Sequence, residues 1–461
     1  MFKNMINFLP LKIIELAKKL PKSIFVVGGF VRNFLINGTP SNDIDLAGTL
    51  SVEDMSTALF ECDFKVVTKI DRTGTVIFFD GEQKYEYTRF RFEEYHGGEH
   101  TPFKTDFTDD IKVDALRRDF KCNAVYYDIK NQKIVDPLGG VDDIKNKVLD
   151  TVCEPEKVFS NDGLRLMRLA RFAGELNFTP TEKVIDGAKK YAKNIKEISA
   201  ERIYAELIKI LHADTAYPFS SERGHYDALK ILDSTRVLDY IIPELTDGRG
   251  MVQRADFHLY DVLEHSLRTV RHADKSVRLG ALLHDVGKPF CLRRDGYYYQ
   301  HFSEGEKIAE NILNRLKADN ETIKQVKFLV REHMVDLDCS MRESKVRMFI
   351  VKNHARLKEL MLIKQADFRA SLEAHDVAPT LIKWDRIYKK MLVDGTPFEL
   401  KDLKISAVDL IEMGYEKENI GKELKKLMGL CAVTPEKNKR QDLLSIAERD
   451  MIRGFSKKEF N

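Results

Sequence analysis

Two aspartates near the start of the chain have the type and the spacing of metal ligands. Asp43 and Asp45 lie one residue apart in the stretch FVVGGFVRNFLINGTPSNDIDLAG, residues 25–48. Two carboxylates that face the same way repel each other unless a cation lies between them. Mg²⁺ binds oxygen ligands and is typically held by one or two carboxylates together with substrate phosphates. The pair therefore predicts a magnesium site that serves a phosphorylated substrate.

Residues just before this pair suit the phosphates of such a substrate. Gly28 and Gly29 let a ligand approach the backbone closely, and a helix that follows them offers free N–H groups to an anion. Arg32 lies one turn into that helix and can donate to the same phosphates. Because bound metal ions stabilise the attacking and leaving oxygens, the stretch favours phosphoryl-type transfer.

The local pattern predicts the elements that position these residues. We expect a helix over residues 1–20, a buried strand over 24–28, a short helix over 29–37 and a strand over 43–47. Side chains at i and i+2 of a strand point to the same face, as the aspartate pair requires. Further β-rich stretches, FKVVTKI, TVIFFDG and KYEYTRFRF, and a hairpin of NAVYYDI with KIVDPLGG, complete a small mixed sheet.

Helical periods dominate the chain after this sheet. The segment DGLRLMRLARF, residues 162–172, predicts a helix whose charged residues recur every three positions. These residues are Asp162, Arg165, Arg168 and Arg171. Apolar residues fill the gaps, so we expect one charged stripe on a largely buried helix. Charges in such a place need partners, and an anionic ligand is one.

Composition limits the class of protein. The chain has 461 residues. A single hydrophobic core rarely organises a chain of this length, so several domains are expected. Lys and Arg total 75 against 73 Asp and Glu. A basic surface that binds a nucleic acid would therefore have to be a local patch. Six scattered cysteines without a CxxC pair indicate reduced thiols in a cytosolic protein. No run approaches the ~20 apolar residues that span a bilayer, so no membrane partner is expected.

Together these patterns predict an α+β protein with a mixed-sheet head and a long all-α remainder. We expect four domains: a head over 1–140, a helical neck over 141–254, a histidine-rich helical region over 255–375 and a C-terminal helical region over 376–461.

At this point the sequence resembles a family. The opening stretch is similar to the first signature of the class II nucleotidyltransferases, the bacterial CCA-adding tRNA nucleotidyltransferases and their poly(A) polymerase relatives. That signature has Asp where this chain has Asn33, which we interpret as a structural position because Asn keeps the hydrogen bonds but not the charge. LRRDFKCNA, residues 116–124, resembles the second signature, with Lys121 for the usual Thr. DGLRLMRLARF resembles the base-reading motif, with Asn161 where Glu is common.

The resemblance implies roles for the matching residues. Asp43 and Asp45 would hold Mg²⁺, with Glu86 in KYEYTRFR as the candidate third catalytic carboxylate. Asp162 and Arg165 would read the base edge, because cytosine and adenine both present an exocyclic amine next to a ring acceptor. The implied nucleotide-binding residues are Gly28, Gly29, Arg32, Arg117, Arg118, Asp119, Asp162, Arg165, Arg168 and Arg171.

A second group of candidate ligands lies in the histidine-rich region. The adjacent His284 and Asp285, with His265 upstream and Asp367 downstream, resemble the HD phosphohydrolase domain of many bacterial members of this family. The positions that extend this ligand set in two-metal versions are matched by His301 and His333. Imidazoles with carboxylates suit a divalent transition metal. The alternative interpretation is that the histidines only pack, as relics of a degraded domain.

The activity implied by the resemblance is addition of C, C and A to tRNA 3′ ends from CTP and ATP, with release of pyrophosphate. Residues 93–108 resemble the flexible loop of enzymes that complete the A, which weighs against a CC-only enzyme. Residues 403–428 resemble the C-terminal segment of bacterial CCA-adding enzymes, and a helix N-terminus next to lysines suits phosphate contacts. These features imply tRNA as partner and a cytoplasmic location.

Two alternatives share the same motifs. A poly(A) polymerase or an A-adding enzyme would carry every head signature. An HD phosphohydrolase whose head only binds nucleotide would carry the same histidine set. The sequence leaves these alternatives, the HD metal and the oligomeric state open.

Overall fold

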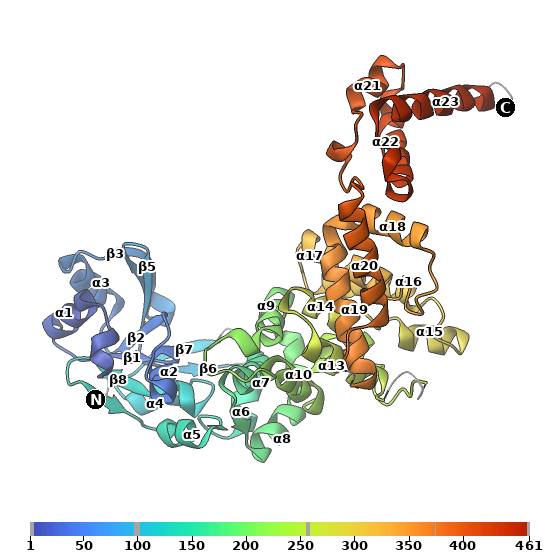
Figure 1. Cartoon of the computed structure of the whole chain (residues 1–461). Coiled ribbons are helices and arrows are strands. Elements are labelled where there is room, and N and C mark those ends of the chain that lie inside the picture. Colours follow the sequence, from blue (N-terminus) through green and yellow to red (C-terminus); the bar gives the residue numbers. More distant parts are fainter. Residues whose placement is uncertain (1–3, 96–101, 255–258, 374, 459–461) are drawn as a thin grey trace. The chain divides into compact units, whose positions relative to one another are not determined.

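The computed structural model of this chain describes residues 4–95, 102–254, 259–373 and 375–458 (Figure 1). Two compact units make up the chain. One consists of Met1–Asp247 with Ile312–Ala318, and the other of Gly248–Asn311 with Asp319–Asn461. Among the described residues, no helix has both the length and the apolar composition that crossing a membrane requires. The division into four domains stays a prediction.

A seven-stranded mixed sheet forms the head, with strand order β3-β4-β5-β2-β1-β8-β9. These strands are β1 (Ile24–Val27), β2 (Ile44–Gly48), β3 (Lys65–Ile70), β4 (Thr75–Asp80), β5 (Gln83–Arg89), β8 (Tyr126–Asp128) and β9 (Lys133–Val135). Neighbouring strands are antiparallel except β2 and β5, which run parallel. The predicted hairpin is β8 with β9, and the predicted α+β class is confirmed.

The order of the central strands brings β5 beside β2, although α3, β3 and β4 separate them in the chain. Asp45 of β2 is then the direct register partner of Glu86 of β5. Along β2, Ile44 and Leu46 are buried while Asp45 is exposed, which is the alternation expected of a strand. The sheet thus sets two carboxylates side by side on a face that solvent reaches.

Three boundaries in the head differ from the sequence-based prediction. The expected helix over 1–20 is two pieces, a 3₁₀ turn at Met5–Phe8 and α1 (Leu11–Lys19), because Pro10 has no N–H and ends the first piece. KYEYTRFRF is also two strands. After β5 ends at Arg89, β6 (Arg91–Glu94) pairs with β7 (Lys104–Phe107) in a separate sheet. Asp43 precedes β2 by one residue, whereas the prediction placed it inside the strand.

The hairpin of β6 and β7 carries the segment that resembles the family's flexible loop. Residues 96–101 of that segment lie outside the described residues. On either side, Arg91 to Glu94 pair in antiparallel register with Phe107 to Lys104. The stretch that we expected to be a loop over 93–108 therefore consists, where it is described, largely of paired strand.

Helices cover the head sheet and make up the rest of the first unit. They are α1, α2 (Gly29–Asn37), α3 (Val52–Glu61), α4 (Ile111–Leu116), α5 (Gly140–Asn146), α6 (Pro155–Asn161), α7 (Leu164–Leu176), α8 (Glu182–Lys190), α9 (Ala200–Leu211), α10 (Gly224–Ser234), α11 (Leu238–Ile241) and α12 (Pro243–Thr246). A short parallel pair, β10 (Val148–Leu149) with β11 (Thr179–Pro180), lies among them. The predicted helix over 29–37 is confirmed as α2.

Helix α7 is almost entirely buried and packs against α9 and α10. Gly174 of α7 and Gly224 of α10 touch backbone to backbone, since a Cβ on Gly174 would lie 2.3 Å from the Gly224 carbonyl oxygen. Ser199 stands at the N-cap of α9, and its side chain makes no capping hydrogen bond. Helix α7, which carries Arg165, is therefore fixed by close packing on two sides.

The second unit is helical. Its helices are α13 (Val262–His272), α14 (Arg278–Leu283), α15 (Lys288–Asp295), α16 (His301–Arg315), α17 (Asn320–Glu332), α18 (Glu343–Lys352), α19 (Leu357–Leu372), α20 (Pro379–Val393), α21 (Ala407–Glu412), α22 (Lys417–Val433) and α23 (Arg440–Lys458), although the residues of α16 from Ile312 onward are counted with the first unit. Buried Arg347 of α18 donates to the Ala432 carbonyl of α22 and to Asp394 after α20. This arginine ties the C-terminal helices to those before them.

Candidate functional site

The head carboxylates, by which we mean Asp43, Asp45 and Glu86, gather where β2 and β5 run in parallel. Although solvent reaches Asp45, the surrounding protein partly desolvates its carboxylate and raises its pKa, and the negative charges of Glu86 and Asp43 raise the pKa further. A cation between these groups would relieve that repulsion. The oxygens of these three residues do not lie as close together as the ligand atoms of a closed metal site. Among the described residues, groups of side chains that lie so close occur only in the second unit.

The turn from β1 into α2 lies against the same carboxylates. Gly28 has φ +81° and ψ −138°, a conformation that residues with a Cβ rarely adopt. A Cβ built on Gly28 would lie 3.6 Å from an Asp45 carboxylate oxygen. The N-terminus of α2 therefore starts next to Asp45, so a phosphate held by its N–H groups would lie beside the carboxylates.

Arg32 is nearly fully buried and already has protein partners. Its Nη1 donates to Asn123 Oδ1 at 2.6 Å, and its Nη2 donates to Tyr217 Oη at 3.1 Å. Asn33 accepts from Nε and Nη2 of the same guanidinium at 3.1 and 2.9 Å. Asn33 thus acts as an acceptor that orients Arg32, in agreement with the structural interpretation of this position.

Asp119 and Arg168 form a close ion pair between the head and α7. Nε and Nη2 of Arg168 both donate to Asp119 Oδ2, at 2.8 and 2.5 Å. The other oxygen of Asp119 accepts from the Asn123 side chain at 3.0 Å and from the Phe120 N–H at 2.8 Å. Burial alone would raise the pKa of Asp119, but Arg168 and Asn123 hold it well below its usual range.

Arg117 and Arg118 both point at one buried carboxylate that the sequence analysis missed. Asp114 accepts from Arg117 Nε at 2.7 Å and from Arg118 Nη2 at 3.2 Å. Tyr126 of β8 donates to the same carboxylate at 2.7 Å. Burial would raise the pKa of Asp114, yet the two arginines and the tyrosine lower it to about 2. Asp114 therefore fixes the direction of both guanidinium groups.

Asp162 does not lie on the predicted helix, and this prediction was wrong. It caps the C-terminus of α6 with an extended backbone, φ −144° and ψ 109°, and α7 begins at Leu164. The chain turns at Gly163 because that residue packs on Asn194, where a Cβ would lie 2.2 Å from the carbonyl oxygen. Asp162 still lies 3.8 Å from Arg165, so the proposed base-reading pair stays together.

The predicted charged stripe is also interrupted at its C-terminal end, where Arg171 lies. Arg171 donates to Glu206 of α9 at 2.6 Å and to Glu175 at 3.0 Å, and all three side chains are buried. Arg165 by contrast donates to the Arg117 carbonyl at 2.5 Å and lies over the Tyr95 ring. Arg165 and Arg168 therefore face the head, whereas Arg171 is an internal cross-link between two helices of the neck.

In the second unit, six residues form what we call the histidine cluster. They are His265, His284, Asp285, His301, His333 and Asp367. They come from α13, α16, α19 and the residues that follow α14 and α17. All six are buried, and they form two groups of three whose possible ligand atoms lie within 4.8 Å of one another.

The cluster consists of two groups of three donors. In one, His265 Nε2 lies 3.2 Å from His284 Nε2 and 3.0 Å from Asp367 Oδ1. In the other, His301 Nε2 lies 3.4 Å from His333 Nε2 and 3.3 Å from Asp285 Oδ1. Asp285 Oδ2 turns to the first group, 3.2 Å from His284 Nε2. Asp285 therefore presents one carboxylate oxygen to each group.

The outer nitrogens of three imidazoles are held by backbone carbonyls. Nδ1 of His284, His301 and His333 lies 2.8, 2.9 and 2.8 Å from the carbonyl oxygens of Ala281, Tyr298 and Val330. Such contacts place the proton on Nδ1 and leave the Nε2 lone pair free to bind a metal. Both Asp285 oxygens are buried without a well-aligned hydrogen bond. The cluster thus fits two divalent cations that share Asp285.

Charge inside the cluster is partly balanced by a lysine that the sequence analysis did not select. Lys288 Nζ lies 2.6 Å from Asp285 Oδ2. Burial raises the pKa of Asp285, but His284 and Lys288 hold it well below its usual range. Burial also lowers the pKa of His333 to about 4. Asp285 lies in the turn that follows α14 and Lys288 is the first residue of α15, and a single charged pair of this kind forms no repeating pattern that would have identified the lysine.

Comparison with known proteins matches three family models to successive parts of the chain. Residues 24–150 match the poly A polymerase head domain, residues 177–248 match the probable RNA and SrmB-binding site of polymerase A, and residues 258–369 match the HD domain. Separate parts of this chain thus match the models of a poly A polymerase head and of an HD domain. The head domain contains β1 to β9 with the head carboxylates, and the HD domain contains the whole histidine cluster.

Curated relatives of this head-and-HD chain are tRNA nucleotidyltransferases. The A-adding tRNA nucleotidyltransferase of Deinococcus radiodurans is 32% identical over 278 residues, 57% of this chain and 61% of that protein. A CCA-adding enzyme of a Geobacillus species is 33% identical over 254 residues, 55% of this chain and 59% of that enzyme. The chain thus spans about three-fifths of the length of these relatives. The multifunctional CCA protein of Haemophilus ducreyi is 27% identical, with 76% of this chain and 86% of that protein covered.

Solved structures share the fold of the head-and-HD chain. The CCA-adding enzyme of Bacillus stearothermophilus in complex with CTP aligns over 100% of this chain and 99% of its own, with a TM-score of 0.66 and 22% identity. The Thermotoga maritima CCA-adding enzyme complexed with tRNA aligns over 97% and 98%, with a TM-score of 0.59 and 16% identity. The predicted head followed by many helices is the fold of these proteins.

Proposed function

We propose that this chain is a tRNA nucleotidyltransferase that adds C, C and A to tRNA 3′ ends from CTP and ATP and releases pyrophosphate. The observation that carries the proposal is the side-by-side register of Asp45 and Glu86, next to the N-terminus of α2. Asp43 and Asp45 would hold Mg²⁺, and Glu86 would complete the acidic face. The bound ion would stabilise charge on the attacking and leaving oxygens.

The head residues would hold the nucleotide around this centre. The backbone at Gly28–Gly29 and the N-terminus of α2 would bind the triphosphate, with Arg117 and Arg118 as the nearby cations. Asp162 and Arg165 would present an acceptor and a donor to the base edge. Asp119, Arg32, Arg168 and Arg171 have internal partners, so we propose that they act by holding this frame rigid.

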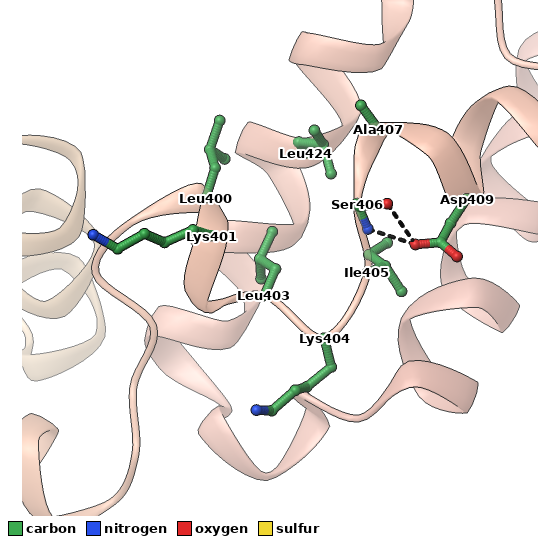
Figure 2. Close-up of a pocket in the computed structure, with 9 residues that line it drawn as sticks. All are labelled: Leu400, Lys401, Leu403, Lys404, Ile405, Ser406, Ala407, Asp409 and Leu424. Atoms are coloured by element: carbon green, nitrogen blue, oxygen red, sulfur yellow. Dashed lines mark hydrogen bonds between the residues drawn. The ribbon is translucent and has the colours of Figure 1, made fainter.

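The tRNA would be bound through shape and phosphate contacts on the helical regions. In the C-terminal region, a pocket of about 500 Å³ is lined by Leu403, Ile405 and Leu424, with Lys401 and Lys404 at its edge. Figure 2 shows both lysine side chains extending away from the apolar ones, and Asp409 accepting from Ser406. We propose these lysines as phosphate contacts. Lys401→Glu with Lys404→Glu should weaken tRNA binding and flatten its salt dependence.

Primer extension on tRNA that lacks CCA, with CTP and ATP supplied separately and together, tests the proposal. We expect C addition with CTP and completion only when ATP follows. Extension with ATP alone past one residue would favour a poly(A) polymerase. Addition of one A only to tRNA that already ends in CC would favour an A-adding enzyme. Asp45→Asn should abolish transfer without changing the fold. The control is Asp80→Asn, at the last residue of β4, which should leave transfer intact.

A second activity is proposed for the histidine cluster, because Asp285 presents one oxygen to each group of donors. Two divalent transition metals bound there would activate water against a phosphate ester, such as that of a damaged tRNA end. Hydrolysis of cyclic phosphates and nucleotides should require metal and should disappear when His284 and Asp285 are both replaced by Ala. If chelation and this double substitution change nothing, the HD domain is structural. If hydrolysis remains in a chain that shows no transfer, the protein is an HD phosphohydrolase whose head only binds nucleotide.

Location follows from the proposed substrate. An enzyme that completes tRNA 3′ ends works where tRNA precursors are made, so we propose that this chain acts in the cytoplasm. Fractionation of cells that express the chain would test this.

A further inference from the structure

Lys288 is a buried cation next to Asp285, the carboxylate that the two groups of donors share. It is the first residue of α15, only 6% of its surface is exposed, and its Nζ lies 2.6 Å from Asp285 Oδ2. Its other close acceptor is Gln253 Oε1, at 2.7 Å. Gln253 is 7% exposed, and its amide nitrogen donates to the Tyr260 carbonyl. The ammonium thus lies between a candidate metal ligand and a fixed amide.

The contact with Asp285 is electrostatic in character. Neither Asp285 oxygen accepts a well-aligned hydrogen bond, although Nζ lies close. Two carboxylates, Asp285 and Asp367, meet inside a buried group of imidazoles, and a buried negative charge is costly without a partner. Lys288 supplies one positive charge to this group. Its position at Oδ2 is on the side of His265 and His284, where a cation held by the first group of donors would lie.

A lysine ammonium and a divalent cation compete for one carboxylate oxygen, because like charges bound to the same oxygen repel each other in a buried site. Gln253 offers the ammonium a place to remain when a metal ion takes Oδ2. The positive charge of Lys288, once it has left Asp285 and lies beside two metal ions, is well placed to bind the oxygens of an anionic phosphate.

We propose that Lys288 neutralises Asp285 while the cluster holds no metal, and that metal binding displaces the ammonium toward Gln253, where it binds a phosphate oxygen of the substrate. This inference rests on the metal-dependent activity proposed for the histidine cluster. It gives Lys288 two opposite effects: the lysine weakens the binding of metal and strengthens the binding of phosphate.

The test uses the full chain with Asp43→Asn and Asp45→Asn, so that the head does not bind metal. Mn²⁺ binding and then the binding of inorganic phosphate to the Mn²⁺-loaded chain are measured by titration calorimetry. Lys288→Met should bind Mn²⁺ about tenfold more tightly and phosphate at least tenfold more weakly. Lys288→Arg keeps the charge and should restore phosphate binding to within about threefold. Lys307→Met, at an exposed lysine of α16, should change neither.

Gln253→Met gives a prediction of the opposite sign and remains informative if Lys288→Met does not fold. Without the amide acceptor the ammonium has only Asp285, so Mn²⁺ should bind at least threefold more weakly. Unchanged Mn²⁺ and phosphate binding in Lys288→Met and Gln253→Met overturns this inference alone. If the chain with an intact cluster binds no more Mn²⁺ than the same chain with Asp285→Asn, the proposed metal site fails and this inference fails with it.

Discussion

Asp119 and Arg168 meet through two hydrogen bonds to a single carboxylate oxygen, at 2.8 and 2.5 Å, although 49 residues separate them in the chain. Asp119 follows the head helix α4, and Arg168 lies in the middle of α7. Asn123 joins the same carboxylate to Arg32 of α2. The Asp119 carboxylate therefore connects α2, through Asn123, with α7, through Arg168.

Arg168→Met should destabilise the first unit by about 3 kcal/mol. The substitution leaves the Asp119 carboxylate, which is 5% exposed, without its cation, and an unpaired buried charge is far more costly than a missing pair. Hydrogen exchange of peptides that cover residues 119–128 measures the loss. Adding Asp119→Asn to Arg168→Met should restore most of the protection, since no charge then remains unpaired. Equal protection in the single and double variants would contradict this explanation.

Gly28→Ala should reduce both stability and nucleotide transfer. At φ +81° and ψ −138° an alanine costs about 1–3 kcal/mol, and relief of that strain moves the turn that lies against Asp45. Gly38→Ala is the matched control, because Gly38 also has a positive φ, +74°, but a Cβ there would meet nothing within 4 Å. Gly38→Ala should cost about 1 kcal/mol and leave transfer unchanged. The measurements are thermal unfolding and CMP incorporation into tRNA.

The sequence predicted the head carboxylates for a local reason. Asp45 is exposed between buried Ile44 and Leu46, and the sequence shows the same alternation of apolar and charged residues. The neighbour on the next strand is different. Glu86 reaches Asp45 only because β5 lies beside β2 in parallel, with α3 and two strands between them in the chain. No local pattern contains that crossover, and Glu86 was found through resemblance alone.

Errors in the charged stripe have the same origin. A period of three predicts one helix from Asp162 to Arg171, but close packing of Gly163 on Asn194 ends one helix and starts another. The partner of Arg171, Glu206, comes from a helix 35 residues later. Asp114 and Lys288 were missed because a single charged residue has no period. Their importance follows from what surrounds them after folding.

The stability of the first unit should depend on pH through Asp114. Burial opposes ionisation, but Arg117, Arg118 and Tyr126 lower the pKa of Asp114 to about 2, below the unfolded value of about 3.9. A lowered folded pKa contributes stability that is fully present above the unfolded pKa and disappears as pH falls through the folded one. The contribution is about 2 kcal/mol at pH 7. Asp114→Asn should therefore cost that amount at pH 5–7, and the difference should vanish between about pH 4 and pH 2.

Hydrogen exchange of peptides from β8, measured at each pH in the wild type and in Asp114→Asn, reports the difference in stability between the two proteins. Peptides from β8 are suitable because Tyr126 of β8 donates to Asp114. Tyr126→Phe removes one donor to Asp114 and leaves both arginines, so it should give a smaller loss of stability over the same pH range. A difference between wild type and Asp114→Asn that stays constant from pH 7 to pH 2 would mean that the carboxylate charge contributes nothing.

Metal binding to the histidine cluster should stabilise the second unit and leave the head unchanged. Trp384, the only tryptophan of the chain, lies in this unit and donates to buried Asp336 at 2.8 Å, so its fluorescence reports on the unfolding of this unit. A ligand that binds only the folded state at 100 times its dissociation constant adds about 2.7 kcal/mol. Mn²⁺ should therefore raise the urea midpoint of the Trp384 signal, and chelation should reverse the shift.

Asp285→Asn is the decisive variant for this prediction, because Asp285 offers one oxygen to each group of donors. Its loss should remove the effect of Mn²⁺ on Trp384. Asp274→Asn is the control, since Asp274 is an aspartate of the same unit that only caps a turn through Ser276. If Mn²⁺ raises the midpoint equally in Asp285→Asn and Asp274→Asn, the ion binds elsewhere, and the six buried side chains serve packing instead.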